Sequence, residues 1–141
     1  NYIWIGLAPL SAIMCFSKSK RIKALGVLSL PAALFNIGEP LIFGLPIVMN
    51  PLMMIPFVLS YMVIAVVAVV LVSTGILPVP VLTVPWITPA PIKAFLSTNG
   101  SFAAALFVIA TWVILAVVFW PFVKAMEKND LKDELLPIDG K

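Results

Sequence analysis

The hydrophobic positions of this 141-residue chain form long uninterrupted runs that are bounded by charged residues. Ser101–Val123 carries no charge, and at about 1.5 Å per residue it is long enough for a hydrocarbon core of about 30 Å. Ser60–Leu77 is a second run, and its length and lack of breaks favour a helix over a buried strand. Tyr2–Phe16 is also apolar and predicts the last part of a helix. The pattern therefore predicts an all-α, polytopic membrane protein with transmembrane helices.

Prolines interrupt the region between these runs. Four of them recur every five or six residues from Pro40 to Pro56, and each removes a backbone donor and crowds the preceding turn. A continuous helix through Asn36–Pro56 is therefore not expected. Pro78–Pro91 has five prolines in 14 residues and predicts an ordered extended or re-entrant intramembrane loop. Irregular backbone at membrane depth must be buried in protein or line a cavity, and transporters build substrate sites at such broken helices.

Charge indicates how the chain is threaded. By the positive-inside rule, the basic cluster Lys18–Lys23 and the lysines of the charged C-terminal segment lie on the cytoplasmic side. Two ends on one side require an even number of crossings, and the two long apolar runs supply two. Ala24–Leu59 must then enter and leave on the same side, which predicts a re-entrant hairpin with its tip near Asn36–Pro40.

Composition excludes several classes of protein. The chain is 62% apolar and 11% charged, with a mean hydropathy of +1.16, whereas soluble domains are about 45–50% apolar and about 25% charged. The basic residues form no extended stripe, so no nucleic-acid partner is expected. The chain has no His and a single cysteine, Cys15, so it cannot build a Ser-His-Asp site, an internal disulfide or a cysteine cluster for zinc. We expect no metal and no cofactor.

Glu39 is the most informative residue. It is the one charged residue from Ala24 to Ile92, and a carboxylate at membrane depth is costly unless it is paired or wetted. Gly38 allows close backbone approach and Pro40 suits the first turn of a new helix. This position favours a ligand or proton site, and the alternative is a structural carboxylate that caps a helix N-terminus.

Other polar and aromatic residues are weaker candidates. Asn36 offers donors and an acceptor to hydroxyl groups, or else caps the end of the preceding helix. Trp86, close to Thr88 in the second proline-rich stretch, offers an indole face that stacks on sugar rings, or else is an interfacial tryptophan. Lys93 indicates a membrane-surface anchor more than a ligand.

Several motifs together resemble one family of membrane transporters. They are SKSKRIKALGVLSLPAALF (17–35), FNIGEPLIFGLPIVMNP (35–51), VPWITP (84–89) and the terminal WPFVK (120–124). In this order and spacing they resemble the IIC component of bacterial phosphotransferase systems, of the lactose/cellobiose/chitobiose subtype. The resemblance covers nearly the whole chain. The family protein is longer, so we expect this chain to correspond to its C-terminal portion.

The resemblance implies a homodimeric, multi-pass permease of the bacterial cytoplasmic (inner) membrane that binds a disaccharide and carries it inward by alternating access. Its partners are membrane lipid and the soluble IIB protein, with IIA acting indirectly. The sugar is phosphorylated from a phosphocysteine of IIB, so this chain is not expected to be an enzyme by itself. Residues 1–123 would be the membrane-embedded substrate-binding and transport portion, and residues 124–141 a charged cytoplasmic tail.

The resemblance also assigns residues. The Glu of the family motif Asn-x-x-Glu-Pro falls on Glu39, which would accept hydrogen bonds from sugar hydroxyls and is a candidate general base. The Trp of Val-Pro-Trp falls on Trp86, and Asn36, Gly38 and Thr88 complete the expected substrate-binding set. The family commonly has Asn where this chain has Gly38, and its site His lies upstream, so the chain is not expected to transport alone. The alternatives are an ion- or proton-coupled secondary transporter with Glu39 as the coupling site, or a non-transporting membrane scaffold.

Overall fold

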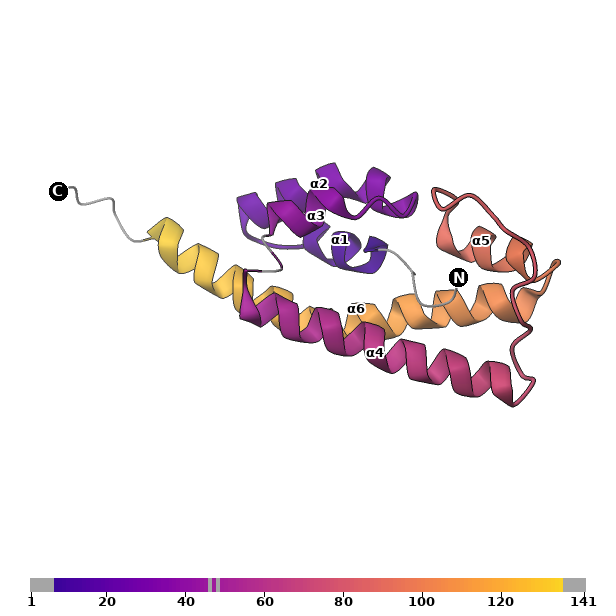
Figure 1. Ribbon diagram of the computed structural model, residues 1–141. Helices are drawn as coiled ribbons and strands as arrows, with labels where there is room; N and C mark the ends of the chain where they lie inside the picture. The colour runs from indigo at the N-terminus through magenta and orange to yellow at the C-terminus, as the bar shows by residue number, and fades with distance from the viewer. Residues whose placement is uncertain (1–6, 46, 48, 136–141) are drawn as a thin grey trace.

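The structure, a computed structural model, describes residues 7–135 except 46 and 48. Within these residues it contains six α-helices and no strand, which confirms the all-α prediction (Figure 1). The helices are α1 (Ala8–Cys15), α2 (Lys20–Leu34), α3 (Glu39–Gly44), α4 (Pro51–Ser73), α5 (Ala90–Ser97) and α6 (Phe102–Leu135).

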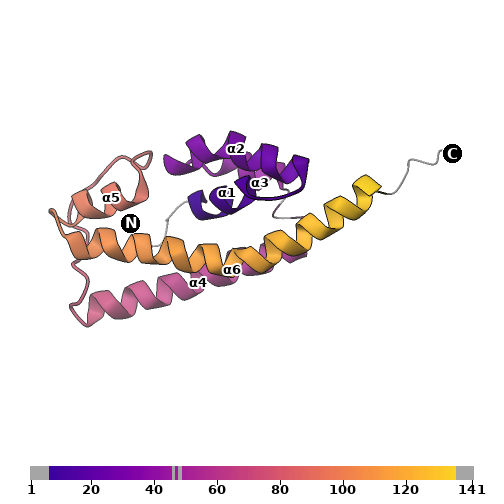
Figure 2. The same ribbon diagram turned by 180° about the vertical axis from the view of Figure 1, so that it is seen from behind.

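The two longest helices, α4 and α6, lie side by side and antiparallel, and α6 also carries α1 and α5 (Figures 1 and 2). Helices α4 and α6 each bury a narrow stripe of side chains spaced three or four residues apart. In α4 the stripe consists of Met53, Pro56, Ser60, Ile64 and Ala68. Both are long and apolar enough to cross a membrane, yet only 22% and 28% of their most apolar windows are buried. The core helix of a soluble protein would be mostly buried, so these exposed apolar faces fit lipid or further helices.

Two helix boundaries differ from the predicted runs. The first long helix is Pro51–Ser73, whereas the pattern predicted Ser60–Leu77. The prediction was wrong because Pro56 does not break α4: it removes one hydrogen bond in the second turn, and it is buried on the same stripe as Ser60 and Ile64. The second helix continues past Val123 to Leu135, so the predicted tail is helical as far as it is described.

Helices α2 and α3 form a helix–turn–helix hairpin. Figure 1 shows α2 running toward the end of the molecule where α5 lies, and α3 returning beside it to the end where α4 begins. The same-side entry into and exit from the membrane stay a prediction. The returning arm is shorter than predicted, because residues 51–59 belong to α4. Pro40 and Pro51 lie in the first turns of α3 and α4, where a missing N–H costs nothing.

The first two helices pack most closely at Gly26. The Ser11 hydroxyl donates a hydrogen bond to the Gly26 carbonyl at 2.8 Å. A Cβ added at position 26 would lie 2.7 Å from Met14 Cβ and 2.8 Å from the main-chain nitrogen of Cys15. These atoms belong to the backbone of α1 or are attached to it, so they cannot move aside alone. The crossing of α1 and α2 therefore requires glycine.

Gly26→Ala should destabilise the protein by about 1–3 kcal/mol, as overpacking of a close-packed contact typically does. Gly44→Ala is the matched control, because an added Cβ there meets the ends of the flexible Leu25 side chain. The measurement is the midpoint of thermal unfolding in detergent. Equal midpoints for the two variants would contradict the close contact at Gly26.

Candidate functional site

The tip of the α2–α3 hairpin is a compact turn. Asn36 adopts the left-handed conformation with φ 63° just beyond the end of α2. Its N–H donates to the Ala33 carbonyl at 3.1 Å, and the N–H of Ile37 donates to the Ala32 carbonyl at 2.9 Å. These two bonds are those of a Schellman motif, in which Asn is one of the residues that tolerate a positive φ. The predicted helix-capping role of Asn36 is therefore confirmed.

The proline-rich segment between α4 and α5 is irregular but anchored. As predicted, the segment has no helix or strand up to Pro89, but α5 begins at Ala90, two residues before the predicted end of the loop, and the place of the loop within the membrane stays a prediction. The N–H groups of Val81 and Leu82 both donate to the Ser97 carbonyl, at 2.8 and 3.0 Å. The start of the segment is thereby fixed to the end of α5.

Asn36 joins the hairpin tip to this segment. Its side-chain nitrogen donates to the Trp86 carbonyl at 3.0 Å and to the Thr88 carbonyl at 2.5 Å. The Asn36 side chain is buried, and its Oδ1 has no hydrogen-bond partner among the described residues. Two carbonyls facing one nitrogen fix the orientation of the amide, because the flipped amide would set oxygen against oxygen.

Glu39 and Gly38 lie at the same tip. Glu39 is exposed in the first turn of α3, where the helix dipole favours a carboxylate, but it accepts no hydrogen bond from the described residues. The Glu39 side chain therefore does not form a hydrogen-bonded cap of α3, which was the alternative role. Gly38 is buried, and a Cβ there would lie 2.9 Å from the end of the Leu7 side chain. The space beside Gly38 is thus occupied by Leu7, and the predicted role of Gly38 in sugar binding stays a prediction.

The structure thus brings three of the predicted site residues into direct contact. Asn36 contacts the main chain of Trp86 and Thr88, and Glu39 follows Asn36 by three residues. The Trp86 side chain is 57% exposed, so its ring is available for stacking. The arrangement offers a carboxylate acceptor and an aromatic face beside one turn. The sugar contacts of these residues stay predictions.

Lys93 does not match its prediction as a surface anchor. It is only 7% exposed, on the face of α5 that also buries Ala90, Ala94 and Ser97. The helix α5 was not apparent in the sequence, because it is short and begins inside the proline-rich stretch.

A second polar cluster, which the sequence did not reveal, lies where the α1–α2 loop meets the C-terminal part of α6. The buried carboxylate of Glu127 accepts hydrogen bonds from the Ser17 hydroxyl at 2.8 Å, the Lys18 N–H at 3.2 Å and the Lys124 ammonium at 3.3 Å. Arg21 pairs with Asp130 at 3.2 Å. These contacts hold the α1–α2 loop against the charged end of α6.

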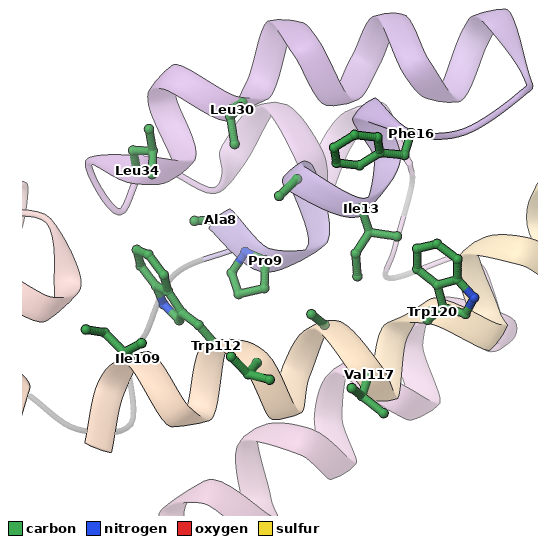
Figure 3. A pocket seen from close by; sticks show the side chains of 13 residues that line it. Ala8, Pro9, Ile13, Phe16, Leu30, Leu34, Ile109, Trp112, Val117 and Trp120 are labelled. Carbon is green, nitrogen blue, oxygen red and sulfur yellow. The ribbon is translucent and has the colours of Figure 1, made fainter. Parts of the chain in front are cut away.

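An apolar pocket of about 620 Å³ lies between α1, α2 and α6. Figure 3 shows Trp112 and Trp120 of α6 projecting beside Phe16 and Leu34. None of the predicted site residues lines it. In the described part of the chain, no group of three or more Cys, Asp or Glu residues is placed to hold a metal ion.

Comparison with known proteins gives the family. The family model described as "Phosphotransferase system, EIIC" matches residues 3–60, which include the hairpin. The crystal structure of the transporter ChbC, the IIC component from the N,N'-diacetylchitobiose-specific phosphotransferase system, aligns with 94% of this chain at a TM-score of 0.91 and 31% identity. The chain belongs to the EIIC family. It spans 32% of the ChbC chain.

Curated EIIC relatives lead to the same family. The oligo-beta-mannoside-specific EIIC component of Bacillus subtilis is 40% identical over 129 residues, which are 91% of this chain and 29% of that protein. The lactose-specific EIICB component of Streptococcus mutans is 39% identical over 123 residues, or 86% of this chain and 21% of that protein. The chain therefore spans less than a third of these EIIC relatives. The two motifs that resemble the EIIC family most specifically, 35–51 and 84–89, are the segments that Asn36 joins.

Proposed function

We propose that this chain is part of a sugar permease of a phosphotransferase system. The permease binds a disaccharide of the cellobiose, chitobiose or lactose type and carries it inward for phosphorylation by a soluble IIB partner. The observation that supports this most is the alignment of 94% of the chain with ChbC, the IIC component from the N,N'-diacetylchitobiose-specific phosphotransferase system. Relatives named for lactose and for oligo-beta-mannoside support a β-linked disaccharide more broadly. The complete permease acts as a homodimer in the bacterial cytoplasmic membrane.

In this proposal α4 and α6 cross the membrane, and the α2–α3 hairpin re-enters the cytoplasmic face without crossing. Two features support it. The contacts of Glu127 and Asp130 bring the basic loop and the charged end of α6 to one end of the molecule. At that end Lys124 lies 5.5 Å from the Trp120 ring, a pairing typical of the membrane–water interface. Residues 7–123 then hold the membrane-embedded portion, and the segment from Lys124 onward lies in the cytoplasm.

Cysteine labelling from each side of the membrane tests this threading. In a Cys15→Ser background, Met49→Cys, an exposed site just before α4, should react with a membrane-impermeant reagent from the same side as Lys20→Cys. Thr74→Cys, exposed just after α4, is the matched control and should react from the other side. Labelling of Met49→Cys only from the side that reaches Thr74→Cys would contradict the hairpin.

The chemical role proposed for Glu39 follows from the free energy needed to hold its carboxylate at membrane depth. Holding a carboxylate at membrane depth costs at least about 2.5 kcal/mol. A hydrogen bond to a charged acceptor contributes about 1.5–3 kcal/mol, so two sugar hydroxyls would offset this cost. Near the reacting hydroxyl, the same carboxylate takes the proton as the phosphoryl group transfers. Trp86 stacks on the sugar ring.

Glu39→Gln, which keeps the shape but loses the charge, should bind sugar at least tenfold more weakly, or about 1.4 kcal/mol, and lose coupled uptake. Glu39→Asp should also fail, because its carboxylate retreats by one methylene. The measurement is cellobiose binding and phosphorylation-coupled uptake by the complete permease in vesicles supplied with IIB. Asp133→Asn, the same kind of change at an exposed site in the last turn of α6, is the control and should behave as wild type. Normal affinity and uptake in Glu39→Gln would overturn the proposed site.

A further inference from the structure

The conformation of Asn36 does not explain its burial. A helix that ends in a Schellman motif needs a residue with a positive φ, and glycine satisfies that need without strain. Asn99 has a closely similar conformation, φ 59°, just after α5. Asn99 is exposed, and its side-chain amide makes no hydrogen bond with the described residues. Asn36 instead is only 3% exposed, and its Oδ1 has no partner among the described residues. Burying an amide with its oxygen unpaired costs free energy. The role of Asn36 is therefore expected in the hydrogen bonds that its amide nitrogen does make.

The two carbonyls that Asn36 binds indicate what its side chain does. Among the described residues, its hydrogen bonds to the Trp86 and Thr88 carbonyls are the ones that fasten residues 84–88 to another element. The Thr88 N–H bonds locally to the Pro85 carbonyl, and the anchor on Ser97 reaches only Val81 and Leu82. The ends of the proline-rich segment are thus fixed by α5, and its middle is fixed by Asn36.

We propose that Asn36 is a positioning residue. It holds the Trp86–Thr88 segment to the hairpin tip, so that the Trp86 ring and the Glu39 carboxylate are presented to the sugar as one unit. Asn36 acts through these neighbours and does not itself have to contact the sugar. This inference rests on the proposed function for its consequence in transport, but the hydrogen bonds themselves can be tested without any sugar.

Asn36→Gly separates the two roles of the residue. Glycine keeps the left-handed turn and removes only the amide, so the hairpin should still fold. Asn36→Asp keeps the shape but sets a carboxylate oxygen against two carbonyls and loses both donors. Asn99→Gly makes the same exchange of Asn for Gly at the end of α5, where no side-chain hydrogen bond is lost.

The first measurement is hydrogen exchange of the complete permease in lipid vesicles without sugar. In Asn36→Gly and Asn36→Asp, the Thr88 amide, whose N–H donates to the Pro85 carbonyl, should exchange at least fivefold faster, equivalent to about 1 kcal/mol. The amides of Val81 and Leu82, held by Ser97, should be unchanged. Asn99→Gly should leave both groups unchanged. Wild-type exchange of the Thr88 amide in Asn36→Gly would overturn the proposal and leave Asn36 as a helix cap only.

The second measurement is cellobiose uptake with IIB present. A misplaced segment weakens sugar binding more than the later steps, so Asn36→Gly should raise KM by at least about threefold and leave the maximal rate within about twofold. Faster exchange with an unchanged KM would overturn the positioning role. Failure of the proposed function gives a different result: Glu39→Gln would then transport normally, whereas exchange of the Thr88 amide in Asn36→Gly would still rise.

Discussion

Backbone that leaves helical geometry must find hydrogen-bond partners, and in a membrane protein water does not supply them. This chain leaves helical geometry at the hairpin tip and again between α4 and α5. At the tip, the two hydrogen bonds of the Schellman motif pair the backbone groups within the turn itself. In the second segment prolines remove N–H groups that would otherwise need acceptors, but they leave carbonyls in need of donors. The two donors of the Asn36 amide meet the Trp86 and Thr88 carbonyls, so one side chain stabilises two irregular segments at once.

Helix α6 is the element on which this arrangement is built. It packs against α1, α4 and α5, and its charged end holds the α1–α2 loop through Glu127. Removing one partner from a buried, hydrogen-bonded charge is far more costly than losing an exposed ion pair such as Arg21–Asp130. The base of the hairpin is therefore fixed at one end of α6. Its tip, one α2 length away, reaches the segment that α5 anchors near the other end (Figures 1 and 2).

Local patterns in the sequence predicted much of this architecture. The charge-free run after Ser101 gives most of the apolar part of α6, and the Gly-Glu-Pro sequence at residues 38–40 marks the start of α3. The features that were missed depend on contacts between distant residues. Pro56 lies inside α4 with its ring buried, and Lys93 is buried in α5, a helix that packs against α6. Glu127 could not be singled out, since its partners Ser17 and Lys18 are about 110 residues away.

In the proposed function, sugar binds where the hairpin tip meets the proline-rich segment, and not in the apolar pocket between α1, α2 and α6. Ile87 lies beside Trp86 and Ile109 lines the pocket, and their exposures of 47% and 46% make them a matched pair. The most direct measurement is the labelling rate of Ile87→Cys and Ile109→Cys, each in a Cys15→Ser permease, with and without cellobiose. We expect cellobiose to slow labelling of Ile87→Cys and to leave Ile109→Cys unchanged. Protection of Ile109→Cys alone would contradict the claim.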